Sequence, residues 1–324
     1  MKRNTLLLVP LVIAVAYSCN PKGTGIDLFS GSSGLSIAYN VAVPDSSGTT
    51  NYEVFTMNTD GSEVRNITNN PDVAWTYRCY DKELYFISDR DTSYRCFFLY
   101  RTDYKGDNVQ KISHLRLEDS WMDFRNDGKE AVVSGRLGTE VRYQLFIIDT
   151  KTGSYKQVTH DTSSLFIDPV FSPDGKLIVA AKKSRRDRTV NEELYQMNAD
   201  GSGLKQLTHY PQDNISRDSS GYKAGSPHWH PSGNFISYIS FQDGKHSIFA
   251  VTPDGEKQWK LTENDFSEGW HDWSPDGNWL TFDMASENND QYHIMLMNMK
   301  SGELRQITGS EYRVQLAPTF IRKY

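Results

Sequence analysis

A repeated sequence pattern constrains the fold of this chain more than any other feature. An apolar residue followed by Thr or Ser recurs six times, at intervals of 45 to 54 residues. The six pairs are Ile67-Thr68, Ile112-Ser113, Val158-Thr159, Leu207-Thr208, Leu261-Thr262 and Ile307-Thr308. Self-similarity at a period of roughly 20 to 50 residues is typical of folds built from stacked or radially arranged units. The sequence therefore predicts one repetitive architecture rather than several unrelated domains.

Each repeat contains the signals of four short β-strands. A turn with glycine, such as Asp60-Gly61 or Asp200-Gly201, precedes every apolar-Thr/Ser pair and can supply the positive φ of a tight hairpin. A second turn follows a strand that ends in an aromatic residue. The aromatic residues that open units in this way are Phe124, Phe171, Trp229 and Trp273. Short runs rich in β-branched and aromatic residues separate the two turns, as expected for strands.

The units add up to a closed ring. Five are complete and start near Val73, Asp119, Ile167, Ser226 and Trp270. The sixth is split, because residues 35–68 supply three strands and residues 314–322 supply an isolated first strand. We therefore expect an all-β fold, a six-bladed propeller of four-stranded antiparallel blades, in which the C-terminal strand completes the first blade. An alternative is that residues 29–34 provide this inner strand.

The second turn carries a resemblance to a known family. The sequences Phe171-Ser172-Pro173-Asp174-Gly175 and Trp273-Ser274-Pro275-Asp276-Gly277 resemble the WD40-like repeat of TolB-type β-propellers. Similar propellers occur in relatives of prolyl oligopeptidase and in oligogalacturonate lyases. The resemblance covers roughly residues 35–324 and implies the fold, whereas propellers carry many unrelated activities. TolB also has an N-terminal α/β domain, which we expect this chain to lack, so the role of TolB is not implied.

The N-terminus predicts a bacterial lipoprotein. Met1-Lys2-Arg3 is basic, and residues 6–16 form an apolar run shorter than a membrane span, which is typical of a secretory leader. The leader ends in Ala16-Tyr17-Ser18-Cys19, which resembles a lipobox and implies that Cys19 is the lipid anchor of the mature protein. Ordinary cleavage, with Cys19 as a spare thiol, is the alternative. The expected organisation is a lipoprotein signal peptide at 1–19, a flexible tether at 20–34 and the propeller at 35–324.

The leader and anchor predict a location in the cell envelope. We expect the protein to be lipid-anchored in the outer membrane, facing the periplasm, as a monomer that touches the membrane only through its N-terminal lipid. The formal net charge of −6 disfavours nucleic acid as a partner, because affinity for nucleic acid depends on basic groups that neutralise phosphates.

Polar and aromatic residues just before the landmark aromatics predict a ligand site. In a four-stranded blade the first strand lies at the central channel, and the loops after the second and fourth strands open on one face. The predicted channel-mouth residues are Trp121, Asp123, Asp168, His228, Trp270, His271 and Asp272. The long polar connection 210–225 is expected on the same face, where loops of such length are often functional. The alternative is that these side chains only pack between blades.

The motifs favour a binding module over an enzyme. The sequence has no Gly-x-Ser-x-Gly, His-Glu-x-x-His or P-loop motif. We expect an interaction module that binds an envelope protein or oligosaccharide without a cofactor. The resemblance to oligogalacturonate lyases implies the alternative, in which His228 and His271 hold a divalent metal such as manganese and acidic oligosaccharides are cleaved by β-elimination.

Two further cysteines, Cys79 and Cys96, lie in one repeat. We expect them on the first and third strands of one blade, about 9 to 10 Å apart, which exceeds the reach of a disulfide. The sequence therefore predicts two buried free thiols.

Overall fold

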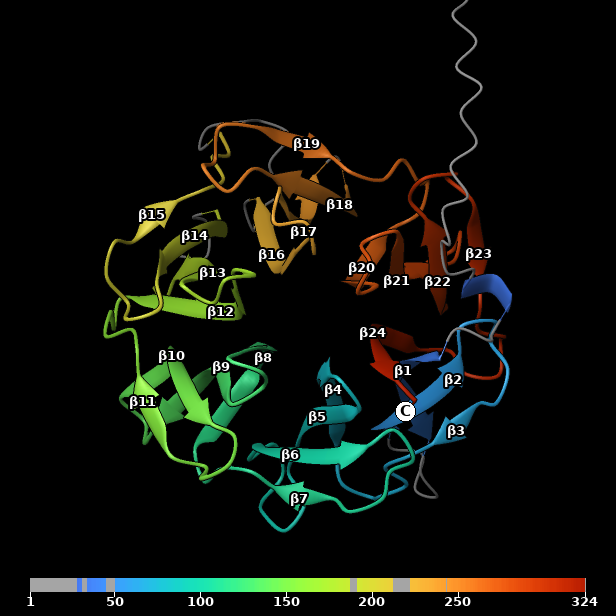
Figure 1. Ribbon diagram of the computed structural model, residues 1–324, viewed down its shortest axis with the longest axis horizontal. Coiled ribbons are helices and arrows are strands. Elements are labelled where there is room, and N and C mark those ends of the chain that lie inside the picture. The colour runs from blue at the N-terminus through green and yellow to red at the C-terminus, as the bar shows by residue number, and fades with distance from the viewer. Residues whose placement is uncertain are drawn as a thin grey trace, which may run out of the picture.

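The structure is a computed structural model that describes residues 28–30, 34–44, 50–186, 191–211, 222–242 and 244–323 of the 324-residue chain. Its strands form six four-stranded antiparallel sheets, arranged as blades around a central axis (Figure 1). The predicted all-β, six-bladed propeller is therefore confirmed.

Within each blade the strands run in order from the axis to the rim. The first three blades are β24 (Gln315–Arg322), β1 (Leu35–Pro44), β2 (Thr50–Asn58), β3 (Arg65–Asn66); β4 (Ala74–Tyr80), β5 (Glu83–Ser88), β6 (Phe98–Asp103), β7 (Gln110–Lys111); and β8 (Arg116–Arg125), β9 (Glu130–Leu137), β10 (Val141–Asp149), β11 (Tyr155–Gln157). The last three are β12 (Ser164–Phe171), β13 (Leu177–Ser184), β14 (Glu193–Asn198), β15 (Lys205–Gln206); β16 (Lys223–Trp229), β17 (Ile236–Gln242), β18 (Lys245–Val251), β19 (Gln258–Lys260); and β20 (Glu268–Trp273), β21 (Trp279–Ala285), β22 (Tyr292–Asn298), β23 (Leu304–Gln306).

The C-terminal strand closes the ring. β24 pairs with β1 in antiparallel register from Leu35↔Arg322 onward, so the first blade contains both ends of the described chain. The alternative inner strand at residues 29–34 is wrong: Leu28–Ser30 form a single 3-10 turn, η1. The Leu28 side chain is buried, and the Phe29 ring meets Trp279 edge to face at 4.7 Å. Residues inside the expected tether thus pack on the first and sixth blades.

The threonine of the apolar-Thr pair has the same structural role in four blades. Its Oγ1 accepts a hydrogen bond from a backbone N–H of the third strand, 14 residues earlier in the chain. The donor-acceptor pairs are Val54–Thr68 at 2.9 Å, Leu145–Thr159 at 2.8 Å, Leu194–Thr208 at 2.8 Å and Ile294–Thr308 at 2.9 Å. The hydroxyl takes the place of a backbone acceptor where the two- or three-residue outer strand ends, which explains why this position repeats.

In four of the six blades the glycine of the hairpin turn fits closely against the blade before it. Gly153 has φ +73°, and a Cβ atom there would overlap the carbonyl oxygen of Ile112, the apolar residue of the preceding repeat pair. Gly61, Gly106 and Gly201 face the carbonyls of Ile307, Ile67 and Val158 in the same way. The two repeated sequence signals therefore contact each other between neighbouring blades.

Replacing Gly153 with alanine is expected to lower the free energy of unfolding by about 3 kcal/mol, because backbone strain and a steric overlap add together. Gly302→Ala is the matched control: Gly302 has φ +74° in the equivalent turn, and no atom lies within 4 Å of its added Cβ. The control should cost only about 1 kcal/mol, the strain of a left-handed alanine. Chemical denaturation measures both, and equal losses would contradict the interblade contact.

The core lies between the faces of adjacent blades. One buried cluster joins Tyr85 and Leu99 of the second blade to Phe124 and Phe146 of the third. Each blade is covered on both of its faces by its two neighbours. The side chains on both faces of a strand are therefore apolar, as in other sheets that are covered on both sides.

The two cysteines are free thiols, as predicted. Cys79 lies on the inner strand β4, and Cys96 lies just before β6 rather than within the third strand. Both are half-buried, so the expectation of buried thiols is wrong. Among the described residues, no helix has the length and apolar character needed to cross a membrane.

Candidate functional site

Every inner strand is interrupted by a bulge at the same depth of the channel. The pairing of the first and second strands shifts register in all six blades. At Asp168, Ser226 and Ala317 the bulge carries a non-glycine residue with φ of 54°, 47° and 57°, which is uncommon. Bulges bend a strand and redirect its side chains, often beside a binding site.

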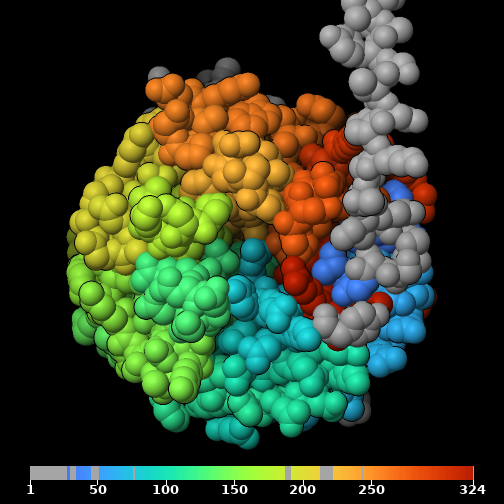
Figure 2. All heavy atoms as spheres, in the orientation of Figure 1, coloured from blue at the N-terminus to red at the C-terminus, as the bar shows by residue number. Residues whose placement is uncertain are grey.

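A cavity of about 710 Å³ lies next to these bulges, at one mouth of the channel. All six blades contribute to its wall, so no single repeat builds the site. Figure 2 shows the blades closely packed around a hollow at the centre of the ring. Of the seven predicted channel-mouth residues, Trp121, Asp168 and Trp270 line this mouth cavity.

Aromatic side chains form one part of the mouth cavity. Tyr52 and Trp75 stack with ring centroids 4.1 Å apart, and Tyr77 lies beside Trp121 with centroids 6.4 Å apart. The Tyr77 hydroxyl donates a hydrogen bond of 2.5 Å to the carbonyl of Glu118, which holds the second and third blades together. The wall therefore offers flat apolar surfaces in fixed positions, a property that suits side chains or sugar rings as ligands.

Carboxylates dominate the charge of the mouth cavity. Its acidic lining residues are Asp119, Asp168, Glu192, Glu268 and Asp283. Among the lining residues that the structure describes, Lys223 is the only lysine or arginine. Two outside cations offset part of this charge: Arg95 lies 3.3 Å from Asp119, and Lys183 lies 3.4 Å from Glu192. The cavity therefore favours a cationic ligand over an anionic one.

Asp168 holds the mouth together. Its Oδ1 accepts a hydrogen bond of 3.0 Å from the backbone N–H of Trp121, and its Oδ2 accepts two of 3.0 Å from the N–H and hydroxyl of Ser226. Asp168 lies on β12, so the carboxylate connects the third, fourth and fifth blades. With its acceptors occupied in this way, Asp168 positions the wall rather than offering a free charge.

Asp283, on the second strand β21, is a buried carboxyl group without a cationic partner among the described residues. Its Oδ2 accepts a hydrogen bond of 2.9 Å from the N–H of Ala317. Burial raises the pKa of Asp283 to about 7, and backbone hydrogen bonds oppose this rise. The neighbouring Gly269 leaves the space that Asp283 fills, because a Cβ there would overlap the carboxylate.

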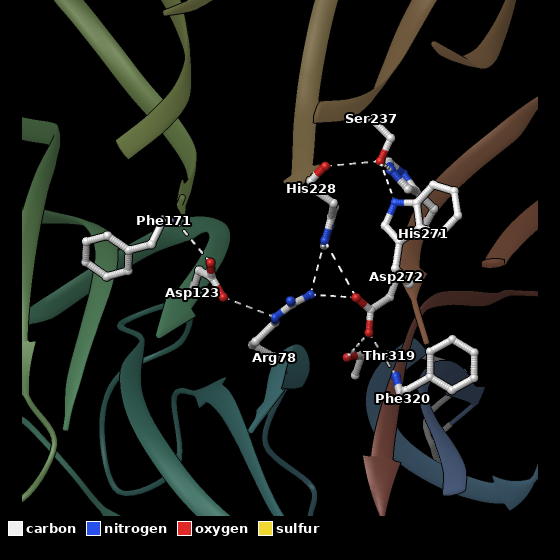
Figure 3. A network of polar contacts seen from close by, with 10 residues as sticks. Arg78, Asp123, Phe171, His228, Ser237, His271, Asp272, Thr319 and Phe320 are labelled. Carbon is white, nitrogen blue, oxygen red and sulfur yellow. Dashed lines mark hydrogen bonds and ion pairs between the residues drawn. The ribbon is translucent and has the colours of Figure 1, made fainter. Parts of the chain in front are cut away.

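The other four predicted residues, Asp123, His228, His271 and Asp272, do not line the mouth cavity. They form a network deeper in the channel together with Arg78 of β4 (Figure 3). The Arg78 Nη1 lies 2.6 Å from Asp272 Oδ1 and 3.1 Å from His228 Nδ1, and Nε lies 3.3 Å from Asp123 Oδ1. One guanidinium group thus spans the channel and joins the second, third, fifth and sixth blades.

The carboxylates of this network also bind the next blade. Asp123 Oδ2 accepts a hydrogen bond of 3.0 Å from the N–H of Phe171, and Asp272 Oδ2 accepts one of 3.0 Å from the N–H of Phe320. Thr319 donates a further bond of 2.9 Å to Asp272. The residue before the landmark aromatic residue therefore accepts hydrogen bonds from the next blade and connects the two blades.

Both histidines of the network are neutral. Burial and then Arg78 lower the pKa of His228 well below its usual range, and burial and then His228 do the same for His271. Because Arg78 donates to Nδ1 of His228, the proton of that imidazole is assigned to Nε2. His271 Nε2 lies 2.7 Å from the hydroxyl of Ser237.

The Nδ1 atom of His228 is not available to a divalent metal. His228 and His271 lie close together, with ring centroids 4.8 Å apart, but the guanidinium of Arg78 occupies the free electron pair of His228 Nδ1. A second cation at that nitrogen would be repelled. Within the described residues, no group of three or more His, Cys, Asp and Glu side chains is placed to hold a metal ion.

Several site residues were not predicted from the sequence. Tyr52, Trp75, Tyr77 and Asp119 line the mouth cavity, and Arg78 centres the network. Residues 212–221 of the long connection 210–225 lie outside the described residues, so its expected position on this face remains a prediction.

No family model matches the sequence. Dipeptidyl-peptidase 5 of Porphyromonas endodontalis is 28% identical over 113 residues, which cover 34% of this chain and 15% of the peptidase. An uncharacterized protein of Agrobacterium fabrum is 27% identical over 84 residues, 26% of this chain and 28% of that protein. The matches thus span less than a third of each relative, and they carry no conclusion about activity.

Solved structures resemble a much larger part of the chain. TolB from Acinetobacter baumannii superimposes with a TM-score of 0.68 and 17% identity, over 92% of this chain and 68% of TolB. A TolB candidate of Agrobacterium tumefaciens gives a TM-score of 0.60 and 18% identity, over 88% of this chain and 90% of that protein.

An oligogalacturonate lyase solved in complex with manganese is also similar, with a TM-score of 0.53 and 15% identity over 80% of this chain and 71% of the enzyme. At such identities the likeness shows the fold alone. The chain therefore has a six-bladed β-propeller fold, similar to that of TolB.

Proposed function

We propose that this protein is a lipid-anchored binding module of the bacterial cell envelope, which receives a basic segment of a partner protein in its mouth cavity. The observation that carries the proposal is the acidic lining of that cavity, in which five acidic residues outnumber Lys223 and the two outside cations, Arg95 and Lys183, beside stacked aromatic rings. Cationic side chains gain both Coulomb attraction and contact with ring faces in such a site.

The size of the cavity fits a short segment of a partner protein as the ligand rather than a whole domain. At about 710 Å³ it is in the range of sites that enclose a few side chains or a small molecule. The interblade bonds of Asp168 fix the wall before any ligand arrives, which reduces the entropy that binding must overcome.

The alternative function, cleavage of acidic oligosaccharides, is disfavoured by the same features. An acidic sugar would bring further negative charge to carboxylates in a partly enclosed cavity. The two histidines proposed as manganese ligands lie deeper in the channel, beside Arg78. We therefore infer no catalytic metal.

The location rests on the N-terminal sequence. Cys19 and residues 1–19 fall outside the described residues, so the lipid anchor, the outer membrane and the periplasm are part of the proposal. Loss of the protein from the membrane fraction on Cys19→Ser substitution is the expected result, and unchanged membrane association would contradict the anchor.

Two short peptides of equal length, one with Lys, Arg and Trp and one with Glu in place of each basic residue, test the proposal. The full chain should bind the basic peptide about tenfold more tightly at low salt, and the difference should shrink at high salt. Tryptophan fluorescence follows binding, because Trp75, Trp121 and Trp270 line the cavity.

Asp119→Asn should weaken binding of the basic peptide about two- to fivefold, since it removes one half-exposed charge from the wall. Asp254→Asn, at an exposed turn between β18 and β19, is the matched control and should leave the affinity unchanged. Preference for the acidic peptide, or formation of unsaturated sugars from oligogalacturonate with manganese, would contradict the proposal.

A further inference from the structure

A second cavity lies beside the mouth, at the joint between the second and third blades. It has a volume of about 280 Å³ and contains four arginines, which together are called the arginine pocket here: Arg95, Arg116, Arg136 and Arg142. Asp119 lines both this pocket and the mouth cavity, so the two are separated by a shared wall.

Two carboxylates compensate only part of this positive charge. Arg136 Nε lies 2.7 Å from Glu118 Oε1, and Arg142 Nε lies 3.2 Å from the same oxygen. Arg95 Nη2 lies 3.3 Å from Asp119 Oδ2. Four guanidinium groups therefore share the charges of two carboxylates in a protein whose formal net charge is −6.

Arg116 carries the uncompensated charge. Within the part of the chain that the structure describes, its side chain has no hydrogen bond or ion pair, although it lines the pocket. Across the sheet it stands directly opposite Arg136, in the pairing of β8 with β9. Like charges opposite each other on neighbouring strands are destabilising, and an anion between them would remove this cost.

The backbone of β10 is bent at this pocket. Its register shifts between Val141 and Gln144, and Tyr143 has a φ of 51°, in the left-handed region. This bulge places Arg142 and Tyr143 in the wall of the pocket. Non-glycine residues with a strained backbone are common at bulges that direct a side chain toward a site.

Aromatic rings limit the movement of two arginines. The guanidinium of Arg95 lies 5.4 Å from the centre of the Phe97 ring, and that of Arg142 lies 5.7 Å from the centre of Tyr143. A planar guanidinium held in place loses less entropy when it forms the paired hydrogen bonds that carboxylates and phosphates accept.

We propose that the arginine pocket binds a small oxyanion group, a carboxylate or a phosphate, through Arg116 together with the free N–H groups of Arg136 and Arg142. The volume admits one such group with its nearest atoms and excludes a folded partner. The arginine pocket can be occupied while the mouth cavity is empty. A ligand that occupies both would carry a positive group in the mouth cavity and a negative group in the arginine pocket, on either side of Asp119.

Calorimetric titration of the full chain, purified in non-ionic detergent, tests the site with separate probes at constant ionic strength. Inorganic phosphate represents a free or lipid-borne phosphate, glucuronate a sugar carboxylate, and N-acetyl-aspartate amide an acidic side chain. At least one probe should bind, and the strongest identifies the source. Chloride at the same ionic strength should not replace it, because a spherical ion cannot make paired hydrogen bonds.

Arg116→Gln should weaken the binding of the strongest probe about tenfold, the effect of losing one charge-assisted contact. This variant leaves both ion pairs of Glu118 intact, so the fold should be retained. Arg65→Gln, an exposed arginine on β3 near Glu63, is the control and should change nothing. Binding of no probe, or equal binding by wild type and Arg116→Gln, would overturn the proposal. Neither result depends on peptide binding in the mouth cavity.

Discussion

Replacing Arg78 with methionine is expected to lower the free energy of unfolding by about 3 to 5 kcal/mol. Methionine retains the length and apolar volume of the side chain but removes the only cation within reach of Asp123 and Asp272 among the described residues. The side chains of these two carboxylates are only 16% and 6% exposed, so water cannot replace the lost partner. The cost is that of two buried charges without compensation.

Four blades meet at this guanidinium, so the loss should affect the whole ring. Denaturant unfolding should show a lower midpoint with an unchanged slope, because the surface exposed on unfolding stays the same. Arg65→Met is the matched control, since the side chains of Arg65 and Glu63 are 57% and 62% exposed. A surface pair of this kind contributes about 0 to 1 kcal/mol.

A double variant separates the charge effect from packing. Asp123→Asn keeps an acceptor for the N–H of Phe171 and removes one uncompensated charge. In the Arg78→Met background it should therefore recover about 1 to 2 kcal/mol, whereas in the wild type it should be destabilising. If Asp123→Asn has the same effect in both backgrounds, the two residues are not coupled and the proposed role of Arg78 fails.

The fold could be predicted from the sequence because its signals repeat. The Thr hydroxyl and the turn glycine each perform the same structural task in four of the six blades, so their spacing predicts the blade count. The closing strand was predictable for the same reason. Residues 35–68 supply a blade that lacks its first strand, and residues 314–322 supply a first strand that lacks a blade, so the two pieces complete each other. No pattern identified the 3-10 turn at Leu28–Ser30, which depends on a pocket beside Trp279.

The site was only partly predictable, because depth along the channel is not encoded by the repeat. Trp121 and Asp123 are two residues apart on β8, but Trp121 lines the mouth and Asp123 lies about 7 Å farther along the strand. The bulge in each inner strand also breaks the alternation of faces on which such assignments depend. Arg78 was missed since its unit lacks a landmark turn of the kind that follows Phe171 and Trp273.

One signal could have identified Asp283. It is a charged residue at the end of the apolar run Trp279–Phe282, in a strand that is covered on both sides. A carboxyl group in such a position must be neutral or paired, and the structure provides no cation for it among the described residues. Its titration should therefore affect the stability of the whole protein.

Asp283 is expected to make the protein less stable at pH 8 than at pH 5, against the opposite trend of the buried neutral histidines His228 and His271. Burial raises the pKa of Asp283 from 3.8 to about 7. The folded protein thus holds a proton that the unfolded chain releases. The stabilisation is complete below about pH 4 and is lost as the pH rises toward 7, by an amount on the order of 2 to 4 kcal/mol.

Asp283→Asn replaces the protonated acid with a neutral side chain of the same shape that can still accept the N–H of Ala317. The variant should be more stable than the wild type by about 1 to 2 kcal/mol near pH 5 and by more than this near pH 8, when urea unfolding is measured at both values. Asp174→Asn is the control, because hydrogen bonds from Ser172 and Lys176 lower the pKa of Asp174 to about 2, below the tested range. Its effect should be equal at both pH values. If the difference between Asp283→Asn and the wild type is also independent of pH, Asp283 is ionised throughout and its burial does not control the titration.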